Sequence, residues 1–401
     1  MWNENKKINF FIMDNVVKNY SWGSKHSLTE LFGIENNSCE PQAELWMGAH
    51  ENGCSSIEID KGEKVLLSDF ISDSPDEILS QRVSATFSNL PFLFKVLAAD
   101  CALSIQVHPS KKEAEDGYEK EVAMGRPISA INRNYKDANH KPELVYALTP
   151  YKAMNGFREY DEIERLLTCV DSPLIETLVN KFSSNKTSSG LKELFKQVVS
   201  LAGKDLSFVI EKLLFAAGKY KDKLAFQTVL ELHSQYGNDV GLFSPLMLNV
   251  INLEPGQAMF LSPRTPHAYI KGTGLEVMAN SDNVLRAGLT NKHIDIEELV
   301  KCTEFSPKDF DSLILPGEVI AGEIAYSNLV DDFSLSVYFS PKEKENIVGS
   351  AEIILSLDSD VLLMHPSGES LKVKKGQSVF IPAYAKKYYL LSMGRVARVY
   401  C

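Results

Sequence analysis

The sequence predicts a mainly β protein with an all-helical insertion, arranged as two jelly-roll β-barrel domains and one helical domain. Three observations support this fold class. Short apolar runs broken by Gly, Pro, Asn and Asp, such as Pro91-Phe-Leu-Phe-Lys-Val-Leu, occupy both ends of the chain and are typical of strands and turns. Apolar residues at helical spacing occupy its middle. A stretch that begins at Leu253 recurs from Val373.

The chain has 401 residues, more than one hydrophobic core usually serves, so several packed units are expected. Strand patterns run to about Pro150 and return at Met247. We therefore expect residues 1–152 and 241–315 to form one discontinuous barrel, residues 153–240 to form the helical insertion, and residues 316–401 to form a second barrel.

The helical insertion is predicted from two apolar patterns with a loop between them. Residues three and four apart share a helix face, and both patterns repeat at that spacing. A loop rich in Ser and Asn, beginning at Ser183, separates them. The apolar positions are Ile163, Leu166, Leu167 and Val170 in the first pattern, and Leu191, Leu194, Val198 and Leu201 in the second.

The internal repeat aligns the stretch Leu253 to Ile270 on the stretch Val373 to Leu390 without gaps. Both copies contain Gly-Gln-x-x-Phe followed by an apolar residue, which predicts a tight turn that leads into a strand. This kernel resembles the signature of cupin barrels. His267 in the first copy aligns with Lys387 in the second, so we expect the C-terminal barrel to be metal-free.

Composition excludes several classes of partner. The formal net charge is −11, and no basic stripe with interleaved aromatic residues offsets it, so we expect no nucleic-acid partner. We also expect no membrane partner, because the sequence has no long uncharged apolar run. The six cysteines are far apart, without a Cys-x-x-Cys pair, which favours reduced thiols and a cytoplasmic protein.

Four candidate metal ligands occur in three motifs. Gln106 and His108 lie two apart in a strand-like run, so their side chains leave the same face. Glu143 follows a proline, and His267 lies in the repeated strand. Two imidazoles, a carboxylate and an amide oxygen suit a catalytic zinc ion, whereas two His and one carboxylate also suit iron. We favour zinc, with iron as the alternative.

Five ordered motifs resemble those of type I mannose-6-phosphate isomerases, members of the cupin superfamily. They are Ala43-Glu-Leu-Trp-Met-Gly-Ala-His, Leu103-Ser-Ile-Gln-Val-His-Pro, Asn139-His-Lys-Pro-Glu, Thr265-Pro-His-Ala-Tyr and Ser281-Asp-Asn-Val-Leu-Arg-Ala-Gly-Leu-Thr. The resemblance implies one zinc ion per chain, bound by Gln106, His108, Glu143 and His267. It also implies interconversion of D-mannose 6-phosphate and D-fructose 6-phosphate through an enediolate intermediate.

The resemblance also implies which other residues contact the sugar phosphate. Those that would bind substrate are Ser104, Lys292, Trp22, Glu44 and Tyr269, and those that would act in catalysis are Arg286, Lys141, His140 and Glu276. We expect a small-molecule sugar phosphate to be the ligand and the chain to act as a monomer, with a dimer as the alternative.

These residue types suit the reaction. Proton transfer next to a carbonyl needs a base with a pKa near neutrality, for which Lys141, His140 and Glu276 are candidates. We expect Lys141 to shuttle the proton and His140 to assist in opening the sugar ring. Arg286 and Lys292 offer a planar fork and a point charge for the phosphate.

Two other functions use part of the same residues. An iron dioxygenase of the cupin type would need the two histidines and Glu143 but has no use for Gln106. A sugar-binding protein without catalysis would need the barrel and Arg286 but has no use for Lys141 beside a metal. Metal analysis, oxygen consumption and turnover distinguish the three.

Overall fold

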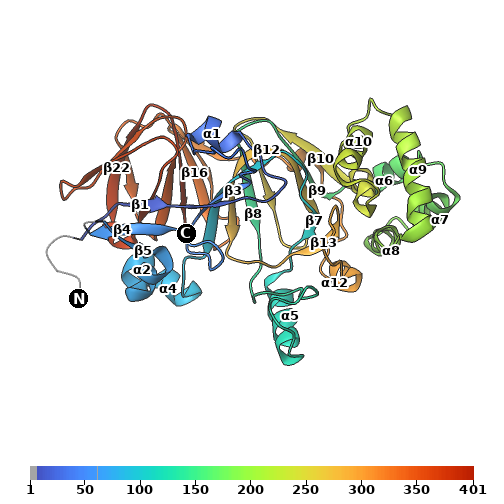
Figure 1. Cartoon of the computed structure of the whole chain (residues 1–401), viewed down its shortest axis with the longest axis horizontal. Coiled ribbons are helices and arrows are strands. Elements are labelled where there is room, and N and C mark those ends of the chain that lie inside the picture. The colour runs from blue at the N-terminus through green and yellow to red at the C-terminus, as the bar shows by residue number, and fades with distance from the viewer. Residues whose placement is uncertain (1–6, 61) are drawn as a thin grey trace. The chain divides into compact units, whose positions relative to one another are not determined.

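The computed structural model describes residues 7–60 and 62–401. The chain forms two compact units. Along the sequence, a group of helices is inserted between two runs of strands (Figure 1). Unit 1 comprises Met1–Ala98, Thr273–Asn280 and Pro316–Cys401, and unit 2 comprises Ala99–Gly272 and Ser281–Leu315. None of the helices in the described part of the chain is both long and apolar enough to cross a membrane. The predicted fold class, mainly β with a helical insertion, is confirmed.

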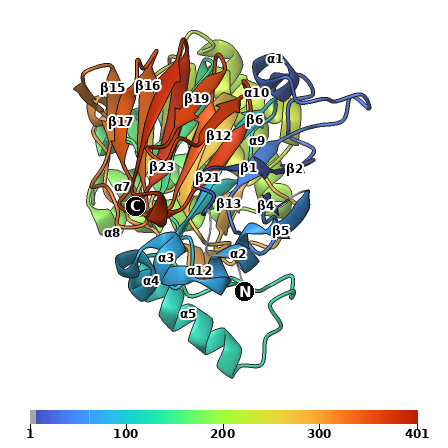
Figure 2. The same ribbon diagram turned by 90° about the vertical axis from the view of Figure 1, so that its left-hand side faces the viewer.

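Two antiparallel sheets of unit 1 face one apolar core (Figure 2). The larger sheet has the order β14 (Glu318–Ile320), β15 (Glu323–Tyr326), β16 (Ser334–Phe339), β23 (Arg395–Tyr400), β18 (Glu352–Ser356), β21 (Ser378–Ile381), β1 (Phe11–Asp14), β4 (Ser56–Asp60) and β5 (Glu63–Leu66). The smaller sheet has the order β17 (Lys344–Ile347), β22 (Lys387–Ser392), β19 (Val361–Met364) and β20 (Ser370–Val373). Their shared core includes Tyr338, Ile354, Leu363, Val379 and Leu390.

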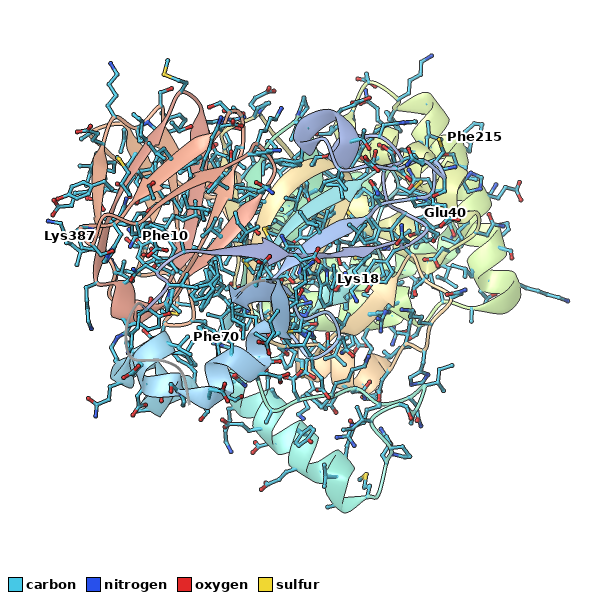
Figure 3. All side chains as sticks on the ribbon, turned by 60° about the vertical axis from the view of Figure 1, so that its left-hand side comes forward. Phe10, Lys18, Glu40, Phe70, Phe215 and Lys387 are labelled. Atoms are coloured by element: carbon cyan, nitrogen blue, oxygen red, sulfur yellow. The ribbon has the colours of Figure 1, made fainter. Side chains whose placement is uncertain are left out.

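The internal repeat is visible in the strand boundaries. In the first copy β11 (Ala258–Leu261) is followed by β12, which begins at His267 and ends at Ala279. Ala258, Leu261 and His267 align with Ser378, Ile381 and Lys387 of the second copy. Ser378 and Ile381 are the first and last residues of β21, and Lys387 is the first residue of β22. Lys387 lies at the outer edge of unit 1, where its Nζ is 3.1 Å from Oε2 of Glu345 (Figure 3).

Unit 1 also contains a short antiparallel group of strands, β6 (Phe92–Ala99), β3 (Glu44–Met47) and β2 (Val16–Lys18), with β3 in the middle. Its small helices are α1 (Ser27–Phe32), α2 (Leu67–Asp73), α3 (Pro75–Leu79) and α4 (Gln81–Phe87). The strand pattern of the sequence did not predict α2 to α4, because each has fewer than eight residues and shows no extended helical periodicity.

The strands of unit 2 bring the predicted site motifs together. Strand β7 (Ile105–Val107) pairs with β12 and with β13 (Leu285–Gly288), and β12 also pairs with β9 (Tyr151–Phe157). Strand β9 pairs in turn with β10 (Leu248–Leu253). Strand β8 (Glu143–Ala147) pairs with β11.

The apolar residues of these strands pack on one face against the helical insertion. Ile105, Val107, Met154 and Ala268 belong to the same core as the insertion's apolar positions. The insertion comprises α6 (Tyr160–Leu167), α7 (Pro173–Ser183), α8 (Ser188–Val199), α9 (Gly203–Lys219) and α10 (Leu224–Tyr236), followed by η1 (Val240–Phe243) and α11 (Ser244–Met247). The other face of the strands is therefore left for polar side chains.

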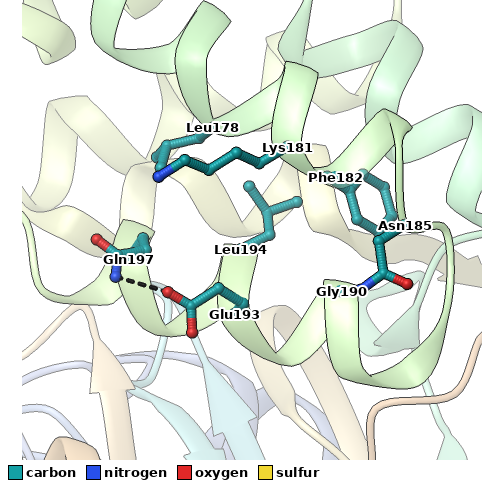
Figure 4. Close-up of a pocket in the computed structure, with 8 residues that line it drawn as sticks. All are labelled: Leu178, Lys181, Phe182, Asn185, Gly190, Glu193, Leu194 and Gln197. Carbon is teal, nitrogen blue, oxygen red and sulfur yellow. Dashed lines mark hydrogen bonds between the residues drawn. The ribbon is translucent and has the colours of Figure 1, made fainter.

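A small cavity of about 160 Å³ lies beside α7 and α8 (Figure 4). Its lining mixes apolar, amide and charged side chains, among them Lys181 and Glu193. The Nε2 of Gln197 donates a hydrogen bond to Oε1 of Glu193 at 2.8 Å. The lining contains no histidine or cysteine, so the cavity lacks the donor set expected of a zinc site.

Helix α5 (Lys111–Ala123) interrupts the strands of unit 2, and α12 (Ile296–Lys301) follows β13. The sequence pattern before Pro150 predicted mostly strands and turns, so α5 was missed. A local signal was present, because Ser110 and Glu113 form a capping box in which each side chain bonds the other residue's backbone N–H.

Candidate metal centre

Four of the predicted site residues share one face of the unit 2 strands. His267 on β12 and Arg286 on β13 are both cross-strand partners of Gln106 on β7. Direct cross-strand partners project to the same face of a sheet. His108 lies two residues after Gln106 and shares that face, while Ile105 and Val107 are buried on the other. The predicted polar and apolar faces of this strand are thus confirmed.

His108, Glu143 and His267 form a buried cluster. The side chains are at most 4% exposed, and their potential ligand atoms all lie within 4.8 Å of one another. Oε1 of Glu143 is 3.2 Å from Nε2 of His108, and its Oε2 is 3.4 Å from Nε2 of His267. A tetrahedral ion with bonds of about 2.1 Å separates its ligand atoms by about 3.4 Å, so the spacing fits a zinc-sized ion.

Hydrogen bonds fix the tautomer of both rings. Nδ1 of His108 is 2.6 Å from the carbonyl oxygen of Asn283, and Nδ1 of His267 is 2.9 Å from that of Thr265. A carbonyl oxygen only accepts, so each Nδ1 carries the proton and each Nε2 presents its lone pair. This is the arrangement of metal-bound histidines, whose second nitrogen is held by an acceptor. Nε2 of His108 has no hydrogen-bond partner among the described residues.

The charges of the cluster follow from burial and neighbours. Burial lowers the pKa of His108 to about 4, so this ring is neutral near pH 7. Burial alone would favour the protonated carboxyl of Glu143, but the charges of His108 in its protonated form and of Lys141 outweigh it and lower its pKa well below the usual range. The hydroxyl of Tyr269 also donates to Oε2 of Glu143 at 2.7 Å. Neutral imidazole and an ionised carboxylate are the forms that bind a cation.

The segment before β8 carries two more predicted residues. Lys141 is 11% exposed, and its Nζ lies 3.4 Å from Oε1 of Glu143. His140 precedes it and is half-buried. The structure therefore places Lys141 next to the carboxylate of the cluster, as its position in the sequence suggested.

Two cations, Arg286 and Lys292, have no acidic counterpart within the described part of the chain. Burial lowers the pKa of Arg286, and burial together with Arg286 and Lys136 lowers the pKa of Lys292. Among the ion pairs of the described residues, neither Arg286 nor Lys292 has a carboxylate within 4.0 Å. Cations that repel one another and lack an acidic partner form a site suited to an anion.

The other predicted substrate contacts divide between the units. Ser104 lies directly before β7 in unit 2. In unit 1, Glu276 and Glu44 face the buried Lys95, with Nζ 2.7 Å from Oε2 of Glu276 and 3.7 Å from Oε1 of Glu44. The indole Nε1 of Trp46 donates to Oε2 of Glu44 at 2.7 Å. Trp22 stacks on the ring of Tyr20.

Two charged residues of these clusters were missed by the sequence analysis. Lys95 lies in the middle of an apolar strand motif that contains no acidic residue. A lysine at a position expected to be buried is unusual, and this could have indicated a distant acidic partner. Lys136 precedes the Asn139-His-Lys-Pro-Glu motif by three residues, and nothing in its local sequence indicates that it lies near Lys292.

Comparison with known proteins agrees with this geometry. The chain matches the family "Phosphomannose isomerase type I, catalytic domain" over residues 10–160 and the corresponding "helical insertion domain" over residues 166–248. It is 45% identical to mannose-6-phosphate isomerase of Escherichia coli (strain K12), over 96% of this chain and 98% of that protein. It is 33% identical to the human enzyme of the same name, over 93% of each chain.

This chain belongs to the type I phosphomannose isomerase family. A crystal structure of mannose 6-phosphate isomerase with zinc bound superposes on this family member with a TM-score of 0.93 and 43% identity, over 98% of this chain and 99% of the other. A mutant phosphomannose isomerase from Salmonella typhimurium gives the same values. The buried cluster thus lies in a chain whose fold matches a zinc-bound phosphomannose isomerase over nearly its whole length.

Proposed function

We propose that this chain is a zinc-dependent aldose-ketose isomerase that interconverts D-mannose 6-phosphate and D-fructose 6-phosphate. The observation that carries the proposal is the buried His108–Glu143–His267 cluster within a type I phosphomannose isomerase fold. Relatives that match nearly the whole chain have the name mannose-6-phosphate isomerase.

We assign one zinc ion per chain to Gln106, His108, Glu143 and His267. The tautomers of both histidines and the spacing of their Nε2 atoms from Glu143 support three of these ligands. The register between Gln106 and His267 supports the fourth, because it places both side chains on one face. When bound, the ion supplies positive charge that polarises the sugar carbonyl and stabilises the oxyanion of the enediolate.

The proton is moved by protein side chains. Isomerisation takes a proton from the carbon next to the carbonyl and returns it to the neighbouring carbon. We assign this transfer to Lys141, whose Nζ lies beside Glu143, and ring opening to His140. Glu276 is the alternative base, and its contact with Lys95 keeps a carboxylate and an ammonium within hydrogen-bond distance.

The phosphate is assigned to the cations that lack an acidic partner. Arg286 presents a planar fork on β13, directly beside Gln106, and Lys292 adds a point charge. Ser104, Trp22, Glu44 and Tyr269 are assigned to substrate binding, and the bond from Tyr269 to Glu143 adds an orienting function for that carboxylate.

The domain organisation and setting follow from the same assignment. We assign catalysis to the discontinuous domain 1–152 and 241–315, with 153–240 as the helical insertion and 316–401 as a C-terminal barrel without metal. We place the protein in the cytoplasm as a monomer that binds a sugar phosphate, without nucleic-acid or membrane partners.

The test is conversion of mannose 6-phosphate to fructose 6-phosphate by purified protein, before and after removal of metal and after addition of zinc. Conversion that is lost and then regained supports the proposal. Oxygen consumption with bound iron would indicate a dioxygenase instead. Sugar-phosphate binding without conversion in any metal state would indicate a binding protein.

A further inference from the structure

The Ser281-Asp-Asn283 motif has no part in the proposed chemistry, yet Asn283 is completely buried. Its side chain is surrounded by the backbone of the segment before β8. Oδ1 accepts from the backbone N–H groups of Lys136 at 2.7 Å and Asp137 at 3.3 Å. Nδ2 faces three oxygens, the carbonyls of Asp137 at 2.8 Å and Asn139 at 2.9 Å and Oδ1 of Asp137 at 3.1 Å. Donors on one side and acceptors on the other fix the orientation of this amide.

The main chain of Asn283 contacts the His108–Glu143–His267 cluster. The carbonyl oxygen of Asn283 accepts the hydrogen bond from Nδ1 of His108 at 2.6 Å. Asn283 therefore bonds to a histidine of the cluster through its backbone and to the segment that leads to Lys141 through its side chain.

Asp137 and Ser281 join the same two segments a second time. The carboxylate of Asp137 accepts from the hydroxyl of Ser281 at 2.8 Å and from the backbone N–H of Asp282 at 2.7 Å. The hydroxyl of Ser281 also lies 3.2 Å from the carbonyl oxygen of Asn139. Such a network, with its buried donors and acceptors paired, favours one arrangement of the two segments over others.

Chain connectivity makes this arrangement relevant to the site. The segment around Asp137 continues into Lys141 and Glu143, and the segment around Asn283 continues into Arg286 on β13. His108 follows Gln106 on β7. The buried amide of Asn283 thus lies where three chain segments meet. These segments carry His108 of the buried cluster, the proposed base Lys141 and the proposed phosphate ligand Arg286.

We propose that Asn283 is a positioning residue that holds His108 and the Lys136–Lys141 segment in register, so that zinc and Lys141 act on the same substrate. This inference rests on the proposed function. A side-chain amide supplies both an acceptor for the two N–H groups on one side and two N–H donors for the oxygens on the other. An aspartate of the same shape would bring a charged oxygen within about 3 Å of those three oxygens and would repel them.

The experiment compares the folded Asn283→Asp variant with the wild type in three measurements, namely kcat and KM for mannose 6-phosphate, zinc affinity by chelator competition, and thermal stability. The repelled side chain should displace the backbone carbonyl that holds His108. We therefore expect kcat and zinc affinity each to fall by about 10- to 100-fold, the usual effect of disturbing a group that orients a metal ligand. We expect KM to change by less than the fall in kcat, because Arg286 and Lys292 are untouched.

Asn346→Asp is the matched control. Asn346 is also a buried asparagine, in unit 1, where it accepts from the hydroxyl of Tyr338 at 2.6 Å and donates to the carbonyl of Lys344 at 3.2 Å. Because Nη1 of Arg398 also donates to Oδ1 of Asn346, at 3.4 Å, the stability of this variant is measured separately. We expect its folded fraction to keep wild-type kcat and zinc affinity. Equal losses in both variants would mean a general structural effect and would overturn the inference.

If Asn283→Asp does not fold, Ser281→Ala decides, because it removes one link of the same network. A lower kcat with unchanged thermal stability supports the inference, and wild-type kcat and zinc affinity in either folded variant overturn it. If the wild type itself does not isomerise mannose 6-phosphate, the proposed function fails, whereas the zinc-affinity comparison still tests the positioning of His108.

Discussion

Arg286 combines a position beside Gln106 with the lack of an acidic partner, and burial lowers its pKa. A phosphate dianion would supply the missing charge. We expect Arg286→Ala to lower kcat/KM by at least about 100-fold, or about 3 kcal/mol, through loss of a bidentate ion pair that strengthens in the transition state. Steady-state kinetics test this, with Arg286→Lys as the control that keeps the charge but loses the fork. A raised KM at unchanged kcat would contradict the transition-state role.

Lys141 is the residue to which proton transfer is assigned, and its Nζ lies 3.4 Å from Oε1 of Glu143. We expect Lys141→Met to lower kcat by about 100-fold or more, the usual contribution of a positioned acid or base. Loss of wash-in of solvent deuterium at C1 of fructose 6-phosphate should accompany it. Lys111→Met, on an exposed side chain of α5, should leave both values unchanged. Near-normal turnover in Lys141→Met would transfer the role to His140 or Glu276.

Lys308 is a half-buried lysine whose Nζ donates to Oδ1 of Asn155 at 3.2 Å, and this partial burial lowers its pKa to about 8. Between pH 8 and its ordinary value of 10.5, the unfolded chain holds a proton that the folded chain lacks. Stability due to this group therefore rises with pH across that window, and its cost is greatest below pH 8.

We accordingly expect Lys308→Met to be more stable than the wild type at pH 7, by up to about 3 kcal/mol. The difference should shrink as pH rises through 8 towards 10.5. Denaturant unfolding at several pH values measures it. A variant that is less stable at pH 7 would show that the bond to Asn155 outweighs the cost of the buried charge.

Among the elements, β12 departs from regular pairing where Gly272 lies. The register with β9 shifts between Tyr269 and Lys271, and Gly272 has a φ of +127°. A Cβ at this position would lie 2.5 Å from the carbonyl oxygen of Pro150 and 2.8 Å from Cα of Tyr151. The close approach of the two strands therefore requires glycine.

We expect Gly272→Ala to lower the free energy of unfolding by about 2 kcal/mol or more, because the methyl group meets backbone that cannot rotate away. Urea unfolding measures this loss. Gly33→Ala is the comparison, since Gly33 also has a positive φ, +69°, but has open space around it. If the free energy of unfolding fell equally in the two variants, the whole effect would come from the positive φ and none from the close approach of the two strands.

At the scale of elements, the sequence predicted what depends on local pattern. Helical spacing located the insertion, and the repeat placed His267 and Lys387 at equivalent strand starts. The strand with Gln106 and His108 was predicted from residues two apart. Lys95, Lys136 and Asn283 were not recognised, because their partners come from segments distant in the sequence, such as Glu276 for Lys95. Pairing between distant segments is set by strand register and packing, which a local pattern does not contain.

At the scale of the whole molecule, an acidic chain must bind an acidic substrate. The formal net charge is −11, and the unpaired cations Arg286 and Lys292 reverse its sign locally. The proposed zinc site would add to this, because one carboxylate among the four proposed ligands would leave zinc with a net positive charge. We expect one ion bound by this cluster to be responsible for isomerisation.

The most direct test of that claim is a titration of metal-free protein with zinc, followed by conversion of mannose 6-phosphate. We expect turnover to rise linearly with added zinc and to stop rising at one zinc per chain, and we expect no such rise in His108→Ala at the same zinc concentrations. Full turnover in metal-free protein, or a wild-type titration curve in His108→Ala, would contradict this expectation.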